Sequence, residues 1–158
     1  MDLQLNSDTP FIKIKKVQSI IAFHVSSQSN LFKDLKSDPM HVGSVIQALD
    51  RAYLHIVDNA DYTEMYMYKI VLNVGRLYGQ LVIDSGQNAA TEMENSYKKR
   101  GYDTLVYKNR GEGCINRNNL SLVVLNPASN ILNIVLHGTL DENSELIFKT
   151  QSWIKNTC

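Results

Sequence analysis

A capped helix that directly follows a glycine turn is the strongest constraint in this sequence. Ser44 and Gln47 have the spacing of a capping box, in which each side chain binds the other residue's backbone amide. Apolar residues then recur at helical spacing to about residue 57, and these are Val45, Ile46, Leu49, Ala52, Tyr53 and Ile56. His41 and Gly43 precede the cap. This corner is therefore either an ordinary loop-to-helix junction or a place where an anionic or polar group binds the helix amides.

Apolar runs predict strands on both sides of this helix. The longest run, residues 62–74, alternates between two sides, which indicates a strand with at least one buried face. Residues 18–25 are predicted as a central strand with His24 near its end. Other predicted strands are residues 11–16, 104–107, 120–125 and 131–137, and Gly75 and Gly79 frame a predicted turn-rich segment with a short apolar run at residues 81–83. We predict one α+β domain over residues 1–158, with a split, mostly antiparallel β-sheet core and flanking helices.

Two further helices and a hairpin complete the predicted layout. Residues 30–36 form a short helix, and residues 89–100 form a longer one with Met93 and Tyr97 on its inner face. Basic residues in its last turn, with Gly101 just beyond, are the expected chemistry of a helix end. Residues 138–144 are predicted as a hairpin turn and residues 145–149 as its return strand, so that residues 137–158 are a C-terminal hairpin and tail.

Composition narrows the class of protein. The chain has 158 residues, 44% of them hydrophobic and 20% charged, which is typical of a folded domain with its own core. Its net charge is zero, which argues against non-specific nucleic-acid binding as the main task. We expect no membrane span and no secretory leader. Cys114 and Cys158 show neither metal-ligand spacing nor a disulfide framework, so a reducing, cytoplasmic setting is expected.

The candidate chemical groups are few. The four histidines match no metal motif, so no metal site is predicted; they are His24, His41, His55 and His137. Cys114 is either a nucleophile paired with a histidine or a bystander, and the lack of an identified base favours the bystander. Glu112 lies between two glycines in a predicted mobile loop, as either a functional carboxylate or a solvated loop residue.

Three segments, in order along the chain, resemble the diphtheria-toxin-type ADP-ribosyltransferase superfamily, and its small phage and bacterial effector-type members in particular. The first is Phe-His-Val-Ser at residues 23–26. The second is His-Val-Gly-Ser at residues 41–44, followed by Ala-Leu-Asp-Arg-Ala at residues 48–52. The third is Gly-Tyr-Asp-Thr-Leu-Val-Tyr-Lys-Asn at residues 101–109, then Glu112-Gly113 and Ser-Leu-Val-Val-Leu-Asn-Pro at residues 121–127. The resemblance covers about residues 20–136.

The resemblance implies a site for NAD as co-substrate. His24 would hydrogen-bond a ribose hydroxyl as a neutral donor, Ser26 would support the same pocket, and the backbone at Val25 would clamp the nicotinamide amide. The turn of His41, Val42, Gly43 and Ser44 would form the far wall of the nicotinamide site.

The resemblance also implies a catalytic acid, and the position that matches is Glu112. It would stabilise the positive charge that develops on the ribose, or activate the acceptor, with Ser121 as a further polar group. The chain departs from the family pattern at Val42, where an aromatic residue would stack on nicotinamide, and at Thr104, where a glycine is usual. Residues 114–119 are also longer than the family pattern, so the position of Glu112 relative to the last strand differs.

The resemblance predicts a small mono-ADP-ribosyltransferase that modifies a macromolecule in a bacterial or host cytosol. Protein is the favoured acceptor, with nucleic acid left open, and a phage anti-defence protein, toxin or bacterial effector is the expected type. The alternative is a catalytically inactive module of the same family that binds and blocks a protein partner. In a third reading, every motif is packing and turn chemistry in a plain structural domain.

Overall fold

The fold consists of two β-sheets with helices packed around them. The computed structural model describes residues 19–31, 35, 38–82, 87–114 and 119–158. The strands in this part are β1 (Ile20–Ser26), β2 (Met40–Val42), β3 (Glu64–Leu72), β4 (Leu77–Val82), β5 (Thr104–Lys108), β6 (Leu120–Val124) and β7 (Ile131–Asp141). The helices are α1 (Val45–Tyr53), the π-helical turn η2 (Leu54–Asp58), α2 (Gln87–Lys99), α3 (Pro127–Asn130) and α4 (Glu145–Thr157).

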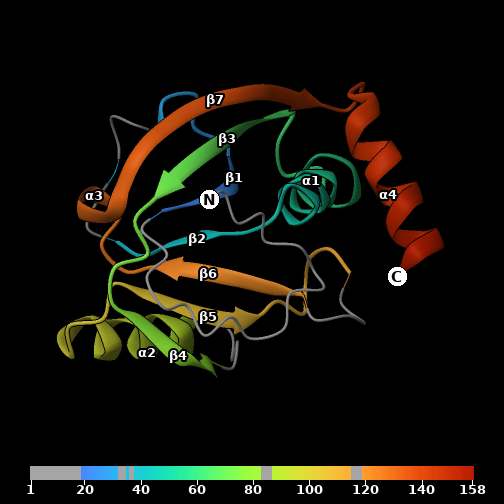
Figure 1. Cartoon of the computed structure of the whole chain (residues 1–158). Helices are drawn as coiled ribbons and strands as arrows, with labels where there is room; N and C mark the ends of the chain where they lie inside the picture. Colours follow the sequence, from blue (N-terminus) through green and yellow to red (C-terminus); the bar gives the residue numbers. More distant parts are fainter. Residues whose placement is uncertain (1–18, 32–34, 36–37, 83–86, 115–118) are drawn as a thin grey trace.

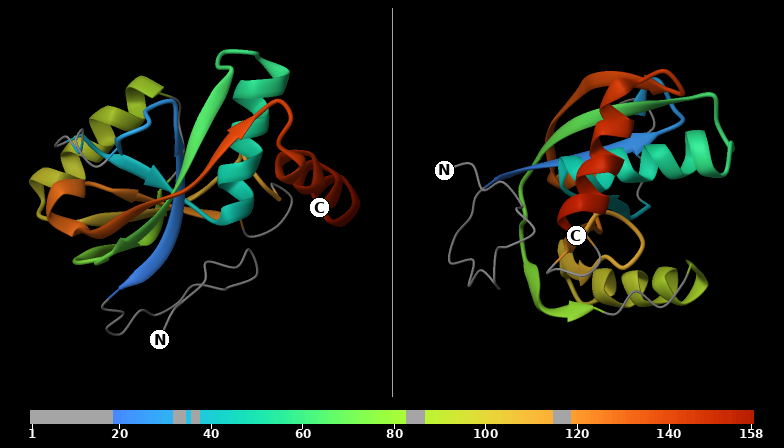
Figure 2. Two further views of the ribbon diagram at one scale, coloured as in Figure 1. Left: turned by 90° about the horizontal axis from the view of Figure 1, so that it is seen from above. Right: turned by 90° about the vertical axis from the view of Figure 1, so that its right-hand side faces the viewer.

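The two sheets confirm the predicted α+β class with a split, mostly antiparallel core. One sheet has the order β1-β3-β7 and the other the order β2-β6-β5-β4, with β4 and β5 as a parallel pair among antiparallel ones. In Figure 1 the first sheet lies above the second, α2 lies beneath the second, and α1 and α4 lie at one side. The two views of Figure 2 show the same arrangement from above and from the side.

The strand β1 lies at the edge of the three described strands of its sheet, and β3 lies at the centre. The predicted central position of β1 is therefore wrong. Its outer edge makes one bridge, in which Phe23 and Gly43 exchange backbone hydrogen bonds of 2.8 and 3.0 Å. That bridge ties the end of β1 to the turn after β2, and so brings His24 beside His41.

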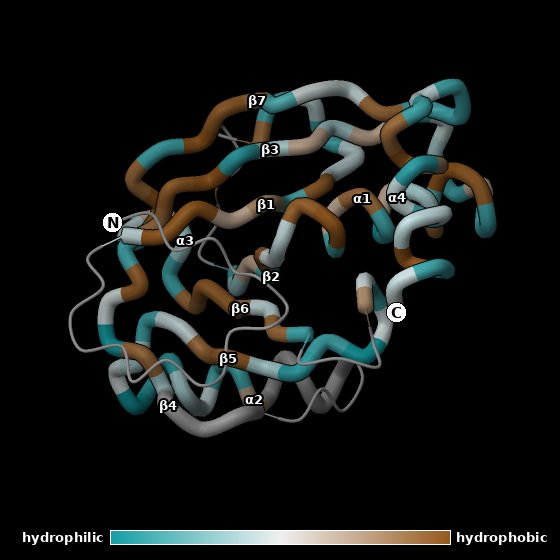
Figure 3. Tube along the Cα trace, turned by 45° about the vertical axis from the view of Figure 1, so that its right-hand side comes forward, coloured by the Kyte–Doolittle hydropathy of each residue, from teal (hydrophilic) through white to brown (hydrophobic). Residues whose placement is uncertain are grey.

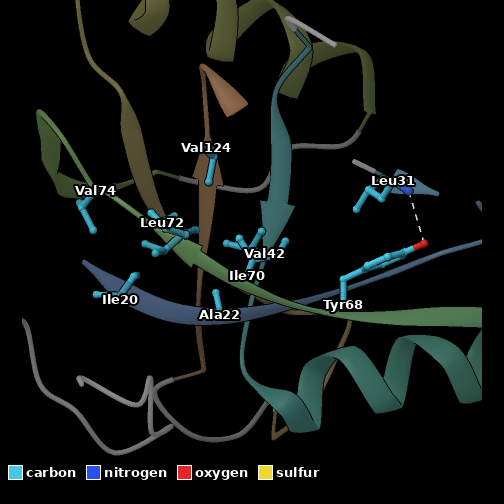
Figure 4. Packing of buried hydrophobic residues seen from close by; sticks show 10 residues of the cluster. Ile20, Ala22, Leu31, Val42, Tyr68, Ile70, Leu72, Val74 and Val124 are labelled. Atoms are coloured by element: carbon cyan, nitrogen blue, oxygen red, sulfur yellow. Dashed lines mark hydrogen bonds between the residues drawn. The ribbon is translucent and has the colours of Figure 1, made fainter. Parts of the chain in front are cut away.

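The main core fills the space between the two sheets. Ala22 of β1, Ile70 and Leu72 of β3, and Val124 of β6 have no exposed surface. Figure 4 shows these side chains packed together, with the Tyr68 hydroxyl near the backbone of Leu31. The hydropathy colouring of Figure 3 places apolar segments along the facing strands of both sheets. This burial is the main stabilising term, because each fully buried aliphatic side chain contributes about 1.5–3 kcal/mol.

The first sheet buries its opposite face against two helices. Met65 and Met67 alternate with the residues that face the second sheet, and they pack with Leu49 of α1 and Ile147 of α4. The alternation predicted for residues 62–74 is therefore confirmed, and both sides of β3 are buried. A strand covered on both faces needs apolar residues at nearly every position, which explains its continuous hydrophobic run.

Several predicted elements are confirmed. The helix predicted after the glycine turn begins at Val45 as α1 and continues through η2. The capping box of Ser44 and Gln47 is present. The helix α2 ends at Lys99 with Gly101 at a positive φ of 79°. The predicted strand over residues 11–16 and most of the predicted helix over residues 30–36 lie outside the described residues.

The predicted C-terminal hairpin is wrong. The strand β7 continues to Asp141, and residues Glu145–Thr157 form the helix α4. Asp141 and Ser144 close a tight turn through their side chains, with the Ser144 hydroxyl donating to Asp141 Oδ1 at 3.0 Å. Ile147 and Thr150 then lie buried on one side of α4 at helical spacing, where α4 packs on the first sheet and α1.

No helix in the described ranges is long and apolar enough to cross a membrane.

Truncating the centre of the main core should lower stability strongly. We expect Ile70→Ala to reduce the free energy of unfolding by about 2–5 kcal/mol, because its side chain is fully buried and the cavity cannot refill. Leu132→Ala is the control, since Leu132 is 60% exposed on β7, and its effect should stay within about 0.5 kcal/mol. Urea unfolding of both variants measures the difference, and equal losses would contradict the assigned core.

Candidate functional site

A large cavity lies where the end of β1, the turn after β2, α1, α2 and the loop after β5 come together. Its volume is about 1040 Å³, which is at the upper end of the range for sites that bind small molecules. Its lining contains His24, Val25, Ser26, His41, Val42, Gly43, Glu112 and Ser121. The structure therefore brings together three segments that are far apart in sequence, and it leaves Ser44 outside the lining.

His24 is held as a neutral ring. Its Nδ1 lies 2.8 Å from the backbone oxygen of His41, which can only accept, so Nδ1 carries the proton. Burial lowers the pKa of His24 below its usual 6.5, and the nearby Arg51 charge lowers it further, against the opposing effect of the hydrogen bond to His41. Nε2 is consequently an acceptor. A ribose hydroxyl would therefore donate to His24, the reverse of the predicted direction.

Both ring nitrogens of His41 are occupied. Nε2 lies 2.8 Å from Glu94 Oε1, and Nδ1 lies 3.0 Å from the hydroxyl of Tyr107, whose ring meets the imidazole edge to face. Glu94 is 6% exposed on α2, and sequence reasoning missed it. The signal was available, because Glu94 lies between Met93 and Tyr97 on the predicted inner face of its helix. His41 is thus a fixed wall of the cavity.

Ser44 serves the helix and not the cavity. Its amide donates to Gln47 Oε1 at 2.8 Å, and its hydroxyl accepts from the Gln47 amide at 3.2 Å. The role of Ser44 in a ligand site stays a prediction, since both groups take part in the cap and Ser44 is absent from the lining of this cavity. Gly43 is required by the same packing, since a Cβ there would overlap the side-chain oxygen of Gln47.

Glu112 is held in place by two neighbours. Arg51 Nη1 lies 2.6 Å from Glu112 Oε1, and Asn109 donates from Nδ2 to Oε2 at 2.9 Å. The amides of Gly111 and Glu112 in turn donate to Asn109 Oδ1, each at 3.0 Å. Arg51 belongs to the Ala-Leu-Asp-Arg-Ala segment, but its role as the partner of the acid was not predicted.

The glutamate loop, residues 109–113, is fixed from beneath by buried amides. Asn119 donates to the backbone oxygens of Asn109 and Glu112, and Gln47 donates to Asn119 Oδ1 at 2.7 Å. The amide of Gly113 donates to Asp50 Oδ2 at 2.6 Å. The flanking glycines predicted a mobile loop, but these bonds hold it against α1.

The two cysteines are joined. Cys114 follows the glutamate loop and forms a disulfide with Cys158 at the C-terminus, with their Cα atoms 5.2 Å apart. The expectation of no disulfide is therefore wrong, and Cys114 has no thiol with which to act as a nucleophile. Two cysteines separated by 44 residues carry no spacing signal, so only the tertiary fold could show this pairing.

Metal chemistry gains no support here. Across residues 19–158, leaving aside the undescribed segments, no group of three or more His, Cys, Asp or Glu side chains is placed to hold a metal ion.

No protein-family model, no curated protein and no solved structure matches the chain. The resemblance to ADP-ribosyltransferases therefore stays a prediction that these comparisons do not test.

The lowered pKa of His24 should make stability depend on pH. The unfolded chain binds a proton at His24 more readily than the folded chain, so this contribution is complete above about pH 6.5 and is lost as the pH falls below it. We expect wild type to lose more unfolding free energy than His24→Gln between about pH 7.5 and about pH 5.5. An imidazole NMR titration should also show His24 below 6.5; a higher value would contradict the neutral ring.

Gly113 should be sensitive to the smallest side chain. Its φ is +74°, and an added Cβ would lie 3.0 Å from Gln47 Cγ and 3.2 Å from Asn119 Oδ1. We expect Gly113→Ala to lower the free energy of unfolding by about 1–2 kcal/mol or more. Gly138→Ala is the matched control, because nothing lies within 4 Å of that position. Chemical denaturation of both variants tests this, and a neutral Gly113→Ala would mean that the loop is loosely held.

Proposed function

We propose that the chain is a mono-ADP-ribosyltransferase that cleaves NAD and transfers ADP-ribose to a macromolecule. The observation that supports this most is the meeting of His24, the His41 turn and Glu112 around one cavity. Each comes from one of the three segments that resemble the family, and they are 17 or more residues apart in sequence. A volume of about 1040 Å³ leaves room for a dinucleotide together with part of an acceptor.

The electrostatics of the cavity agree with this reaction. Breaking the bond between the ribose carbon and the nicotinamide nitrogen sends the electron pair to nicotinamide and leaves positive charge on the sugar. A carboxylate such as Glu112 stabilises that charge when it is held in place beforehand. A neutral His24 accepts a hydrogen bond from a ribose hydroxyl without adding an opposing positive charge.

The aromatic contact that Val42 lacks has other candidates. Val42 is 3% exposed and belongs to the core between the sheets. Phe23 and Tyr107 also line the cavity, from β1 and β5. We propose that one of these rings makes the aromatic contact with nicotinamide in place of residue 42.

A second candidate function rests on the ion pair of Arg51 with Glu112. A guanidinium 2.6 Å from the carboxylate offsets the negative charge that the reaction needs. A chain in which this pair never opens would be an inactive module that binds and blocks a protein partner. The enzyme must bind NAD, whereas the inactive module is expected to show no NAD affinity. A measurement of NAD affinity therefore distinguishes the two functions.

The proposed acceptor is a protein, with nucleic acid as the less favoured class. The proposed place of action is a bacterial or host cytosol, as for a phage anti-defence protein or an effector. The proposed place of action rests on the resemblance alone. The cysteines no longer support a reducing cytosol, because Cys114 and Cys158 form a disulfide.

Labelled NAD tests the proposal directly. Wild type incubated with NAD labelled on the adenine and with a bacterial lysate should label macromolecules. We expect Glu112→Gln to lower labelling by about 10²–10³-fold through loss of the stabilising charge. His24→Ala should weaken NAD binding in calorimetry, and Glu145→Gln, an exposed acid of α4 outside the cavity lining, should leave both readouts unchanged. No label and no NAD affinity in wild type would overturn the enzyme, and partner binding without NAD affinity would select the inactive module.

A further inference from the structure

A histidine–carboxylate pair that neither the sequence motifs nor the proposed reaction uses lies on the wall of the same cavity. His55, in η2, lines the cavity, and its Nδ1 lies 2.8 Å from Asp61 Oδ2. The imidazole also packs against the ring of Tyr62, with centroids 5.9 Å apart. The carboxylate fixes the tautomer, because it can only accept, so Nδ1 carries the proton and Nε2 keeps its lone pair.

The backbone between His55 and Asp61 is irregular, and its shape brings the two side chains together. The helix ends in a π-turn in which the Asn59 amide donates to the Leu54 oxygen at 2.8 Å. Ala60 then adopts a positive φ of 52°, and the Asp61 amide donates to the His55 oxygen at 2.8 Å. A positive φ at a residue other than glycine costs free energy and marks a conformation that the surroundings impose. The result of this turn is that the Asp61 carboxylate reaches back to His55.

The other two histidines of the cavity and the candidate acid Glu112 are poorly suited to remove a proton. Both nitrogens of His41 are occupied by Glu94 and Tyr107. Burial lowers the pKa of His24, which weakens it as a base. Glu112 is bound by Arg51 on one oxygen and by Asn109 on the other. Within the described residues, no hydrogen bond involves Nε2 of His55, so its lone pair is available.

His55 is also in the right place along the helix. It follows Arg51 by four residues, so the two side chains lie on the same face, one turn apart, at about 6 Å along the axis. Arg51 in turn binds Glu112, which stands where charge develops in the proposed reaction. A group bound next to His55 would therefore approach the reacting carbon beside Glu112.

We propose that His55, oriented by Asp61, is the general base that activates the acceptor, and that the acceptor group is a hydroxyl. This rests on the proposed function. As the acceptor oxygen bonds to the ribose carbon, the bond to nicotinamide breaks and its electron pair leaves with the nicotinamide nitrogen. The hydroxyl proton moves to His55 Nε2, and the Asp61 carboxylate stabilises the imidazolium that forms.

The choice of a hydroxyl follows from the chemistry of this pair. A carboxylate acceptor is already ionised at neutral pH and needs no base, and a cysteine thiol ionises far more readily than a hydroxyl, so it depends on a base much less. A guanidinium has no free lone pair and would be repelled by the Arg51 guanidinium one turn away. A hydroxyl has a lone pair for attack. Its proton becomes acidic as its oxygen bonds to carbon, and an imidazole can accept that proton.

The test compares His55→Gln with Glu145→Gln, a change at an exposed acid of α4 outside the cavity lining, in the full chain. The probes are labelled NAD and a bacterial lysate, and the product is treated with neutral hydroxylamine, which cleaves esters to carboxylates and spares glycosidic bonds to hydroxyls. We expect hydroxylamine-resistant label from wild type and from Glu145→Gln, and about 100-fold less from His55→Gln. NAD affinity by calorimetry should be the same in all three, because His55 acts on the acceptor.

Asp61→Asn is the second variant, in case His55→Gln fails to fold. An amide at this position can stabilise the wrong tautomer, so transfer should fall by about tenfold or more while nitrogen NMR shows the proton moved from Nδ1 to Nε2 of His55. Asp58→Asn, an exposed acid of the same turn, is its control. Full transfer by His55→Gln and Asp61→Asn, or label removed by hydroxylamine, would overturn the proposal. A wild type that neither binds NAD nor releases nicotinamide would instead overturn the proposed function beneath it.

Discussion

The buried side chain of Gln47 joins the parts of the molecule on which the cavity depends. It is 2% exposed; its oxygen accepts from the Ser44 amide, and its nitrogen donates to Asn119 Oδ1 and to the Leu120 oxygen. One amide thus completes the cap of α1 and holds the glutamate loop and the start of β6. An amide with these bonds unmade would cost about 1–3 kcal/mol of stability. The glycines at positions 43 and 113 are needed because both pack directly against it.

From this anchor, α1 presents one polar face to the cavity and the loop beside it. Asp50 accepts from the Gly113 amide, Arg51 binds Glu112, and His55 binds Asp61 one turn further on. The opposite face, with Leu49 and Ala52, is buried against the first sheet. The helix therefore couples packing to chemistry, because the same burial that orients its apolar face fixes the direction of its polar side chains.

The sequence was informative where the structure is determined locally. The capping box, the period of α1 and the end of α2 at Gly101 depend on residues within a few positions of each other, and all three are present. Most residues that the resemblance selected line the cavity, but Ser44 does not, and His55 and Glu94 line it from outside the three segments. Prediction failed where the partner is distant. The edge position of β1, the pairing of Glu94 with His41 and the pairing of Cys114 with Cys158 depend on the tertiary fold.

The C-terminal segment shows why short windows mislead. Residues 145–149 hold a short apolar run between two charged residues, which resembles a strand, and only the longer spacing of Ile147, Thr150 and Ile154 indicates a helix. The helix α4 gains its stability from contacts with α1, including the bond from Gln151 to Asp50, which no local window contains. Asp50 thereby binds the glutamate loop with one oxygen and α4 with the other. A helix that lies outside the resemblance is therefore part of what holds the candidate acid in place.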